Sequence, residues 1–153
     1  MKTLIGTAAL GATLVLGTAG PAPAQGNEPA KSTMATTRCP GGYVFTAAGG
    51  SGESGCATPR GGNGVIFLST KVTGEPKGAL QPSHIHKGKC GSNGVFIYTL
   101  SNVVNGSSAT TIPMEKWSTF NHGGYYINIH ASPKDLPNVV SCADITAVGR
   151  GTM

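Results

Sequence analysis

The chain is a succession of short runs of β-branched and aromatic residues separated by clusters of Gly, Pro and Asn, which is typical of an all-β fold. The only helix signal follows Pro113, at 114–120, and allows about one or two turns. Between 46 and 65 the sequence is rich in Gly and Ser, so we predict one long loop there. About seven or eight short strands predict a β-sandwich or a Greek-key β-barrel. The predicted strands are 42–46, 65–72, 84–86, 95–100, 108–112, 125–130 and 143–148.

The N-terminus has the pattern of a secretory signal peptide over residues 1–24, with Lys2 before an apolar stretch and a small-x-small cleavage signal at 22–24. Residues 25–38 are small and polar and are predicted to form a flexible leader, followed by a single β-sandwich domain over 39–153. No other segment approaches the roughly 18 consecutive apolar residues of a membrane helix. We therefore expect a secreted protein, extracellular or periplasmic, without membrane insertion after signal cleavage.

The chain has four cysteines, Cys39, Cys56, Cys90 and Cys142, all after the predicted cleavage site. An even set of cysteines in a small exported protein predicts two disulfides, and the sequence allows about three pairings. The alternative is a Cys-ligated zinc site, which is less favoured because the sequence contains no C-x-x-C pair.

Two short histidine motifs predict a metal site. Successive side chains of a strand point to opposite faces, so His84 and His86 project from one face while Ile85 enters the other. In 125–130 the same alternation places His130 on the polar face, with Tyr126 and Asn128. If these two strands share a sheet, the three imidazoles can meet at one metal ion.

The remaining histidine, His122, is a weaker candidate for a fourth ligand. An unbroken strand would place it about 26 Å from His130, and the surrounding Asn and Gly residues predict a turn instead. Imidazole ligands suit several transition metals, and three of them on strands in an oxidising compartment favour copper. Zinc with a water molecule in the fourth position is the alternative.

The formal net charge of +5 is mild and the basic residues are scattered, so nothing indicates nucleic-acid binding. Lys87, Lys89 and Lys134 nevertheless follow the histidine motifs closely. Positive charge beside a metal attracts small anions, so these lysines are candidates for anion steering. The alternative is that they are ordinary solvated loop residues. The sequence indicates no oligomeric state.

Three motifs in order resemble the copper/zinc superoxide dismutase superfamily, in particular its small secreted bacterial members, which overlap in pattern with CHRD domains. The likeness covers about 64–148. The motifs are His84-Ile85-His86 with Gly88 and Cys90-Gly91, then Tyr126-Ile127-Asn128-Ile129-His130 with Ser132-Pro133, and Val140-Ser141-Cys142-Ala143-Asp144-Ile145.

The resemblance implies a Greek-key β-barrel of immunoglobulin-like shape and a copper ion held by His84, His86 and His130. It also implies a disulfide from Cys90 to Cys142, and partly on this ground we favour Cys39–Cys56 as the second bridge. The substrate implied is superoxide.

The chain also departs from that family. Only 87–94 separate the first histidine pair from the next strand, which leaves no room for the bridging histidine and the zinc ligands of the enzymes, and Val139 stands where they have a substrate-guiding arginine. The sequence therefore predicts a secreted copper-binding protein with a superoxide dismutase-like site, with disproportionation of superoxide as the candidate activity. The alternatives are a non-catalytic copper-binding or CHRD-like module for metal storage and a plain interaction domain, and whether the protein is an enzyme stays open at this stage.

Overall fold

The computed structural model describes residues 38–147. The predicted signal peptide, all but the last residue of the predicted leader, and position 148 of the last predicted strand lie outside the described residues. In the described part of the chain, no helix is long and apolar enough to cross a membrane.

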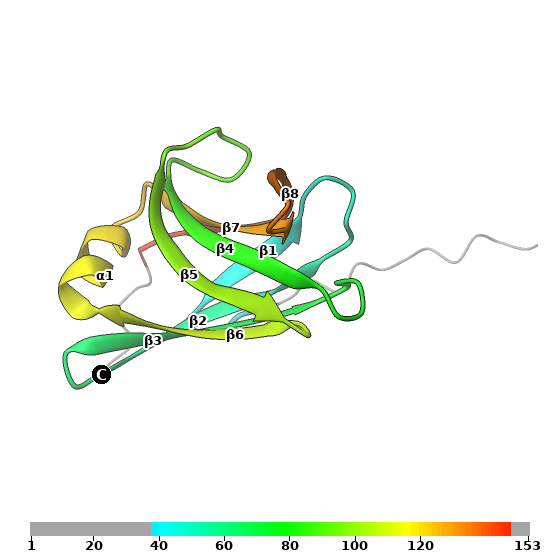
Figure 1. The fold of residues 1–153 in the computed structure, drawn as a ribbon. Helices are drawn as coiled ribbons and strands as arrows, with labels where there is room; N and C mark the ends of the chain where they lie inside the picture. Colours follow the sequence, from blue (N-terminus) through cyan, green and yellow to red (C-terminus); the bar gives the residue numbers. More distant parts are fainter. Residues whose placement is uncertain (1–37, 148–153) are drawn as a thin grey trace, which may run out of the picture. The chain divides into compact units, whose positions relative to one another are not determined.

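Eight antiparallel strands and one short helix make up the described fold (Figure 1). The strands close into a barrel in the order β1-β2-β3-β6-β5-β4-β7-β8, so β3 pairs with β6 and β4 pairs with β7. The all-β prediction is confirmed. The elements are β1 (Tyr43–Ala47), β2 (Ser54–Gly62), β3 (Val65–Thr73), β4 (Leu80–Lys87), β5 (Phe96–Val104), β6 (Ser107–Pro113), α1 (Met114–Phe120), β7 (Tyr125–Ser132) and β8 (Asp135–Ile145).

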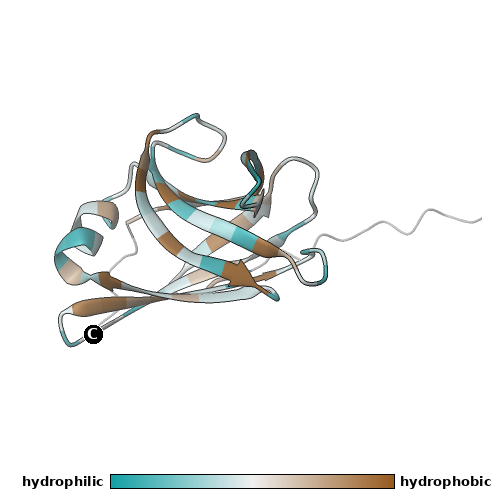
Figure 2. Ribbon diagram, in the orientation of Figure 1, coloured by the Kyte–Doolittle hydropathy of each residue, from teal (hydrophilic) through white to brown (hydrophobic). Residues whose placement is uncertain are grey.

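The core fills the inside of the barrel, where the strands place apolar side chains. Buried and non-buried side chains alternate along the whole of β3, and brown and paler segments alternate along β5 in Figure 2. Ile85, Ile127 and Ile129 are fully buried inside the barrel. Helix α1, predicted at these residues, buries Trp117 and Phe120 at one end of the barrel (Figure 1).

The prediction of a long loop between 46 and 65 is wrong, because strand β2 lies there. Its composition is unlike that of a strand, yet its nine residues all pair with β3. Gly55 is required by this pairing, since a Cβ atom there would overlap the Lys71 carbonyl oxygen. Pro59 is tolerated because β1 pairs only with Gly55, Cys56 and Ala57, which leaves the proline without a β1 partner. Long-range pairing has overridden the local signal.

The last predicted strand is also misplaced. Strand β8 begins at Asp135, well before the predicted start at 143, and ends at Ile145, so it includes Pro137 and Asn138. The turn between β7 and β8 is short, because Ser132 already pairs with Asp135. Register shifts on both sides of His130 show that the β7–β8 pairing is irregular there, which accommodates the proline.

Two disulfides join the described residues in the pairing favoured from the sequence. Cys39–Cys56 ties the segment before β1 to β2, and Cys90–Cys142 ties the β4–β5 loop, 88–95, to β8. The described residues contain no free cysteine. Such bridges are typical of proteins from an oxidising, extracellular-type environment.

Candidate metal centre

Strands β4 and β7 lie side by side, and their pairing brings three histidines together. His84 pairs with Asn128 and Ile85 with Ile127, so the two isoleucines share the inner face and the histidines share the outer face. His130 lies two residues beyond Asn128 on the same face. One ring nitrogen from each of His84, His86 and His130 lies within 4.8 Å of the other two.

Two backbone carbonyl groups fix which nitrogens face this cluster. His86 Nδ1 lies 3.0 Å from the Gly94 carbonyl oxygen, and His130 Nδ1 lies 2.5 Å from the Leu136 carbonyl oxygen. A carbonyl oxygen only accepts, so both Nδ1 atoms carry the proton and donate it. Both Nε2 atoms are then lone-pair donors for a metal, which is the usual arrangement at metal sites.

The third nitrogen belongs to His84, whose Nδ1 lies 3.1 Å from His130 Nε2. Ligand atoms about 2 Å from one tetrahedral metal ion lie about 3.3 Å apart, so this spacing suits a shared cation. His86 Nε2 is buried, and no group among the described residues hydrogen-bonds to it. A buried nitrogen without a partner is costly unless a ligand satisfies it, and this is the observation that fits a metal ion best.

The electrostatics of the cluster favour neutral rings. Burial lowers the pKa of His84, and the neighbouring His130 and His86 lower it further. Burial also lowers the pKa of His130, against the opposing effect of the Leu136 carbonyl group. Neutral imidazole is the form that binds metals, so both shifts favour the metal-binding form of these rings.

Two aromatic side chains hold the first histidine pair. Tyr126, directly opposite His86, stacks on it with ring centroids 5.4 Å apart. Phe96 packs edge-on against His84 at 5.1 Å and against His86 at 6.1 Å. The sequence placed Tyr126 on the histidine face without giving it a role, and Phe96 was missed because nothing in its local pattern separates it from a core strand residue.

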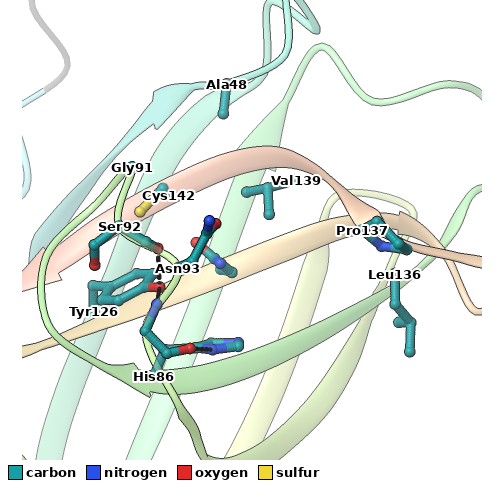
Figure 3. Close-up of a pocket in the computed structure, with 12 residues that line it drawn as sticks. Ala48, His86, Gly91, Ser92, Asn93, Tyr126, Leu136, Pro137, Val139 and Cys142 are labelled. Atoms are coloured by element: carbon teal, nitrogen blue, oxygen red, sulfur yellow. Dashed lines mark hydrogen bonds between the residues drawn. The ribbon is translucent and has the colours of Figure 1, made fainter.

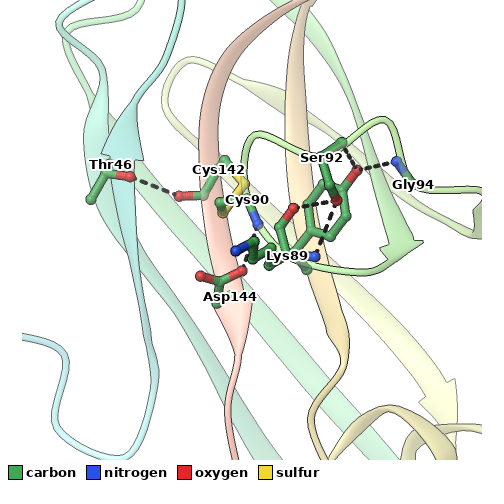
Figure 4. Close-up of a disulfide and its surroundings, with 8 residues drawn as sticks. Thr46, Lys89, Cys90, Ser92, Gly94, Cys142 and Asp144 are labelled. Atoms are coloured by element: carbon green, nitrogen blue, oxygen red, sulfur yellow. Dashed lines mark hydrogen bonds between the residues drawn. A yellow bond between two sulfur atoms is a disulfide. The ribbon is translucent and has the colours of Figure 1, made fainter.

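Tyr126 also anchors the 88–95 loop. Its hydroxyl group donates to the Ser92 carbonyl oxygen at 2.6 Å and accepts from the Gly94 N–H at 3.0 Å. At the other end of the loop, the Cys90 N–H donates to Asp144 Oδ1 at 2.7 Å beside the Cys90–Cys142 bridge (Figure 4). The loop that orients His86 is therefore attached to both β7 and β8.

A hollow of about 340 Å³ adjoins the cluster, with His86 as part of its wall. Figure 3 shows His86 and Tyr126 on one side of it, and Leu136 and Pro137 on another. Val139 of β8 also lines it. No charged side chain of the described residues contributes to the lining.

The other predicted site residues lie elsewhere. His122 is exposed in the turn before β7 and is not part of the cluster, so the structure does not bring it to the three other histidines. Lys87, Lys89 and Lys134 are exposed, and none of them lines the hollow. The carbonyl oxygens that orient His86 and His130, those of Gly94 and Leu136, were missed because a sequence motif carries no information about which carbonyl group a ring will meet.

Comparison with protein-family models, with curated proteins and with solved structures finds no match to this chain. Its class therefore rests on the fold and the site alone. They define an eight-stranded antiparallel β-barrel with two disulfides and a three-histidine cluster on the outer face of two adjacent strands, of a kind that could hold a metal ion.

Proposed function

We propose that this protein is a secreted copper-binding protein whose His84, His86 and His130 hold one copper ion, and that the ion disproportionates superoxide. The observation that carries the proposal is the convergence of three ring nitrogens. In His86 and His130 the Nδ1 atom hydrogen-bonds to a backbone carbonyl group, which leaves the Nε2 lone pair available to a metal. Nitrogen ligands on rigid strands favour copper over hard cations such as magnesium or calcium, and zinc is the competing ion.

Copper supplies a one-electron couple, by which one superoxide anion is oxidised to dioxygen and a second is reduced, with two protons, to hydrogen peroxide. The residues of the chain would bind the ion and hold the histidine rings in a fixed orientation. The carbonyl groups of Gly94 and Leu136 hold His86 and His130 in one orientation, and Phe96 and Tyr126 restrict the rings of the first pair. Three protein ligands would leave a fourth position on a bound ion for solvent or substrate.

The strand order supports the finer fold assignment. The reversed run β6-β5-β4 between β3 and β7 requires connections across the end of the barrel, as a Greek-key arrangement does. The order of the histidine and cysteine motifs and the Cys90–Cys142 bridge also favour a relationship to the copper/zinc superoxide dismutase superfamily or the CHRD domains that it resembles.

A non-catalytic copper-holding module is the second candidate, and the lining of the hollow favours it. A rapid superoxide dismutase draws its anion in with positive charge, whereas the hollow beside His86 has no charged lining residue. Lys87, Lys89 and Lys134 could attract an anion only from the exposed surface. If their effect is small, the site binds copper and turns superoxide over slowly.

Titration of the metal-free protein with copper(II), followed by elemental analysis and a superoxide assay on the same sample, tests both candidates. We expect about one copper ion per chain, lost in His84→Ala and in His86→Ala. His122→Ala is the matched control, because this histidine lies outside the cluster, and should bind copper as the wild type does. Unchanged copper affinity in both cluster variants would defeat the assignment. Copper binding without superoxide turnover would favour the non-catalytic module.

A further inference from the structure

Asn128 occupies the centre of the histidine cluster on the outer face of the barrel. It pairs directly with His84 across the β4–β7 boundary, which places their Cβ atoms about 5 Å apart. His86 is its diagonal neighbour on β4, and His130 is its next neighbour on the same face of β7. One side chain is therefore adjacent to all three candidate ligands.

The Asn128 side chain is buried, with 6% of its surface exposed, yet its amide has no hydrogen-bond partner among the described residues. Its neighbours on the face do not supply one, because His86 and His130 donate to the Gly94 and Leu136 carbonyl groups. The amide atoms of Asn128 are not among the fully enclosed polar atoms that lack a partner, so they stay open to solvent or to a ligand.

The hollow beside His86 supplies the place for such a ligand. Asn128 lines it together with His86, and its volume of about 340 Å³ is several times the roughly 30 Å³ that one water molecule occupies in the liquid. The walls include Leu136, Pro137 and Val139, which offer no hydrogen bond from their side chains. Of the two β7 residues in this wall, Tyr126 already uses its hydroxyl group in hydrogen bonds to Ser92 and Gly94, which leaves the amide of Asn128.

We propose that Asn128 and this hollow form the anion subsite of the metal centre. The Asn128 Nδ2–H donates a hydrogen bond to a small anion that enters the hollow and reaches the metal, and superoxide is the anion that the proposed activity requires. The inference rests on the proposed copper site. It assigns anion recognition to a neutral amide donor, not to a cationic side chain, in keeping with the uncharged lining.

Azide binding to the copper-loaded protein, followed by its absorption spectrum, tests the subsite apart from catalysis. In Asn128→Leu, which keeps the size of the side chain, we expect azide affinity to fall about tenfold or more, because a hydrogen bond to a charged group is lost. Copper stoichiometry should stay at the wild-type value. Asn93→Leu is the matched control, because Asn93 also lines the hollow but is exposed on the 88–95 loop, and its azide affinity should not change.

Asn128→Asp provides a second, independent reading. The carboxylate should tighten copper binding and weaken azide binding, because it attracts the cation and repels the anion. Equal azide affinity in the wild type, Asn128→Leu and Asn128→Asp would overturn the subsite while leaving the copper site intact. Equal losses in Asn93→Leu and Asn128→Leu would also overturn it, since the hollow in general would then be responsible. A wild-type protein that takes up no copper would instead defeat the proposed function, and the subsite with it.

Discussion

His86 and Gly94 are joined by a hydrogen bond of 3.0 Å from the imidazole Nδ1 to the glycine carbonyl oxygen. His86 lies in β4 just before the 88–95 loop and Gly94 lies near the end of the loop, so the backbone of this loop determines which nitrogen of His86 faces the metal site. The loop is in turn held by Tyr126 and by the Cys90–Cys142 bridge. The geometry of one candidate ligand thus depends on a segment that contributes no ligand.

Gly94→Ala should disturb this arrangement directly. A Cβ atom at Gly94 would overlap the Lys87 carbonyl oxygen and lie 2.9 Å from Tyr126 Cε1, so the backbone must shift and carry the carbonyl group away from His86. We expect a loss of about 1–3 kcal/mol in the free energy of unfolding and weaker copper binding, measured by denaturation and metal titration. Gly62→Ala is the control, because a Cβ there meets only Phe67 Cε2, at 3.9 Å. Wild-type copper affinity in Gly94→Ala would show that the loop does not position His86.

Tyr126→Phe should separate the stacking of Tyr126 from its hydrogen bonds. The phenyl ring can still stack on His86, but the Ser92 carbonyl oxygen and the Gly94 N–H lose their partner. We expect about 1–3 kcal/mol of lost stability, and a copper(II) spectrum altered by the looser loop. Tyr98→Phe serves for comparison, since no described residue hydrogen-bonds to the Tyr98 hydroxyl group. A spectrum identical to that of the wild type would limit Tyr126 to a role in stability.

The two disulfides should differ in their effect on the metal. On chain entropy alone, Cys90–Cys142 spans 52 residues and should stabilise the fold by about 4 kcal/mol, whereas Cys39–Cys56 spans 17 and should contribute about 3 kcal/mol. The double variant Cys90→Ser/Cys142→Ser frees the 88–95 loop, so it should lose copper affinity as well as stability.

Cys39→Ser/Cys56→Ser should lose stability alone, since that bridge lies at β2, away from the histidines. Calorimetry and copper titration of both double variants check this difference. Equal copper affinity in the two, with the folds retained, would show that the loop keeps its position without its disulfide.

Much of the fold was predictable because its signals are local. The alternating runs gave most strands, and Pro113 marked the helix. Strand β2 and the first half of β8 were not predictable from their composition, since residues such as Gly55 and Asp135 form strands here only because neighbouring strands pair with them. Strand pairing is a property of the whole barrel and leaves little trace in the paired segment itself.

The candidate site was likewise predictable only in part. The period of a strand was enough to place His84 and His86 on one face, and the structure brings His130 to them because β4 and β7 pair in the required register. The hydrogen-bonding environment was not predictable, because Gly94 and Leu136 act through their backbone carbonyl groups. The hollow beside His86 forms where the 88–95 loop lies against β8, which no single segment encodes.

Glu53 and Gln81 form a buried pair whose contribution to the stability of the fold should depend on pH. Gln81 Nε2 donates to Glu53 Oε1 at 2.6 Å, but Glu53 Oε2 and Gln81 Oε1 are both buried without a partner among the described residues. Burial raises the pKa of Glu53, the hydrogen bond from Gln81 opposes this, and the charge of Glu75 adds to it. The folded protein thus binds this proton more tightly than the unfolded chain does, so the contribution to stability is full below the unfolded-state pKa and is lost as pH rises through the folded-state pKa.

Glu53→Gln should remove the loss of stability at high pH, because the new amide is uncharged and its N–H group can donate to Gln81 Oε1. We expect the variant to melt at a higher temperature than the wild type at about pH 8, with a gain of about 1–3 kcal/mol, and the difference to shrink towards about pH 4. Thermal unfolding of the metal-free wild type and variant across this pH range measures the difference in melting temperature. The histidines titrate in both proteins, so they do not contribute to this difference. Glu115→Gln, at an exposed helix position, should show no such trend. A melting difference independent of pH would mean that the folded and unfolded states bind the Glu53 proton equally over this range.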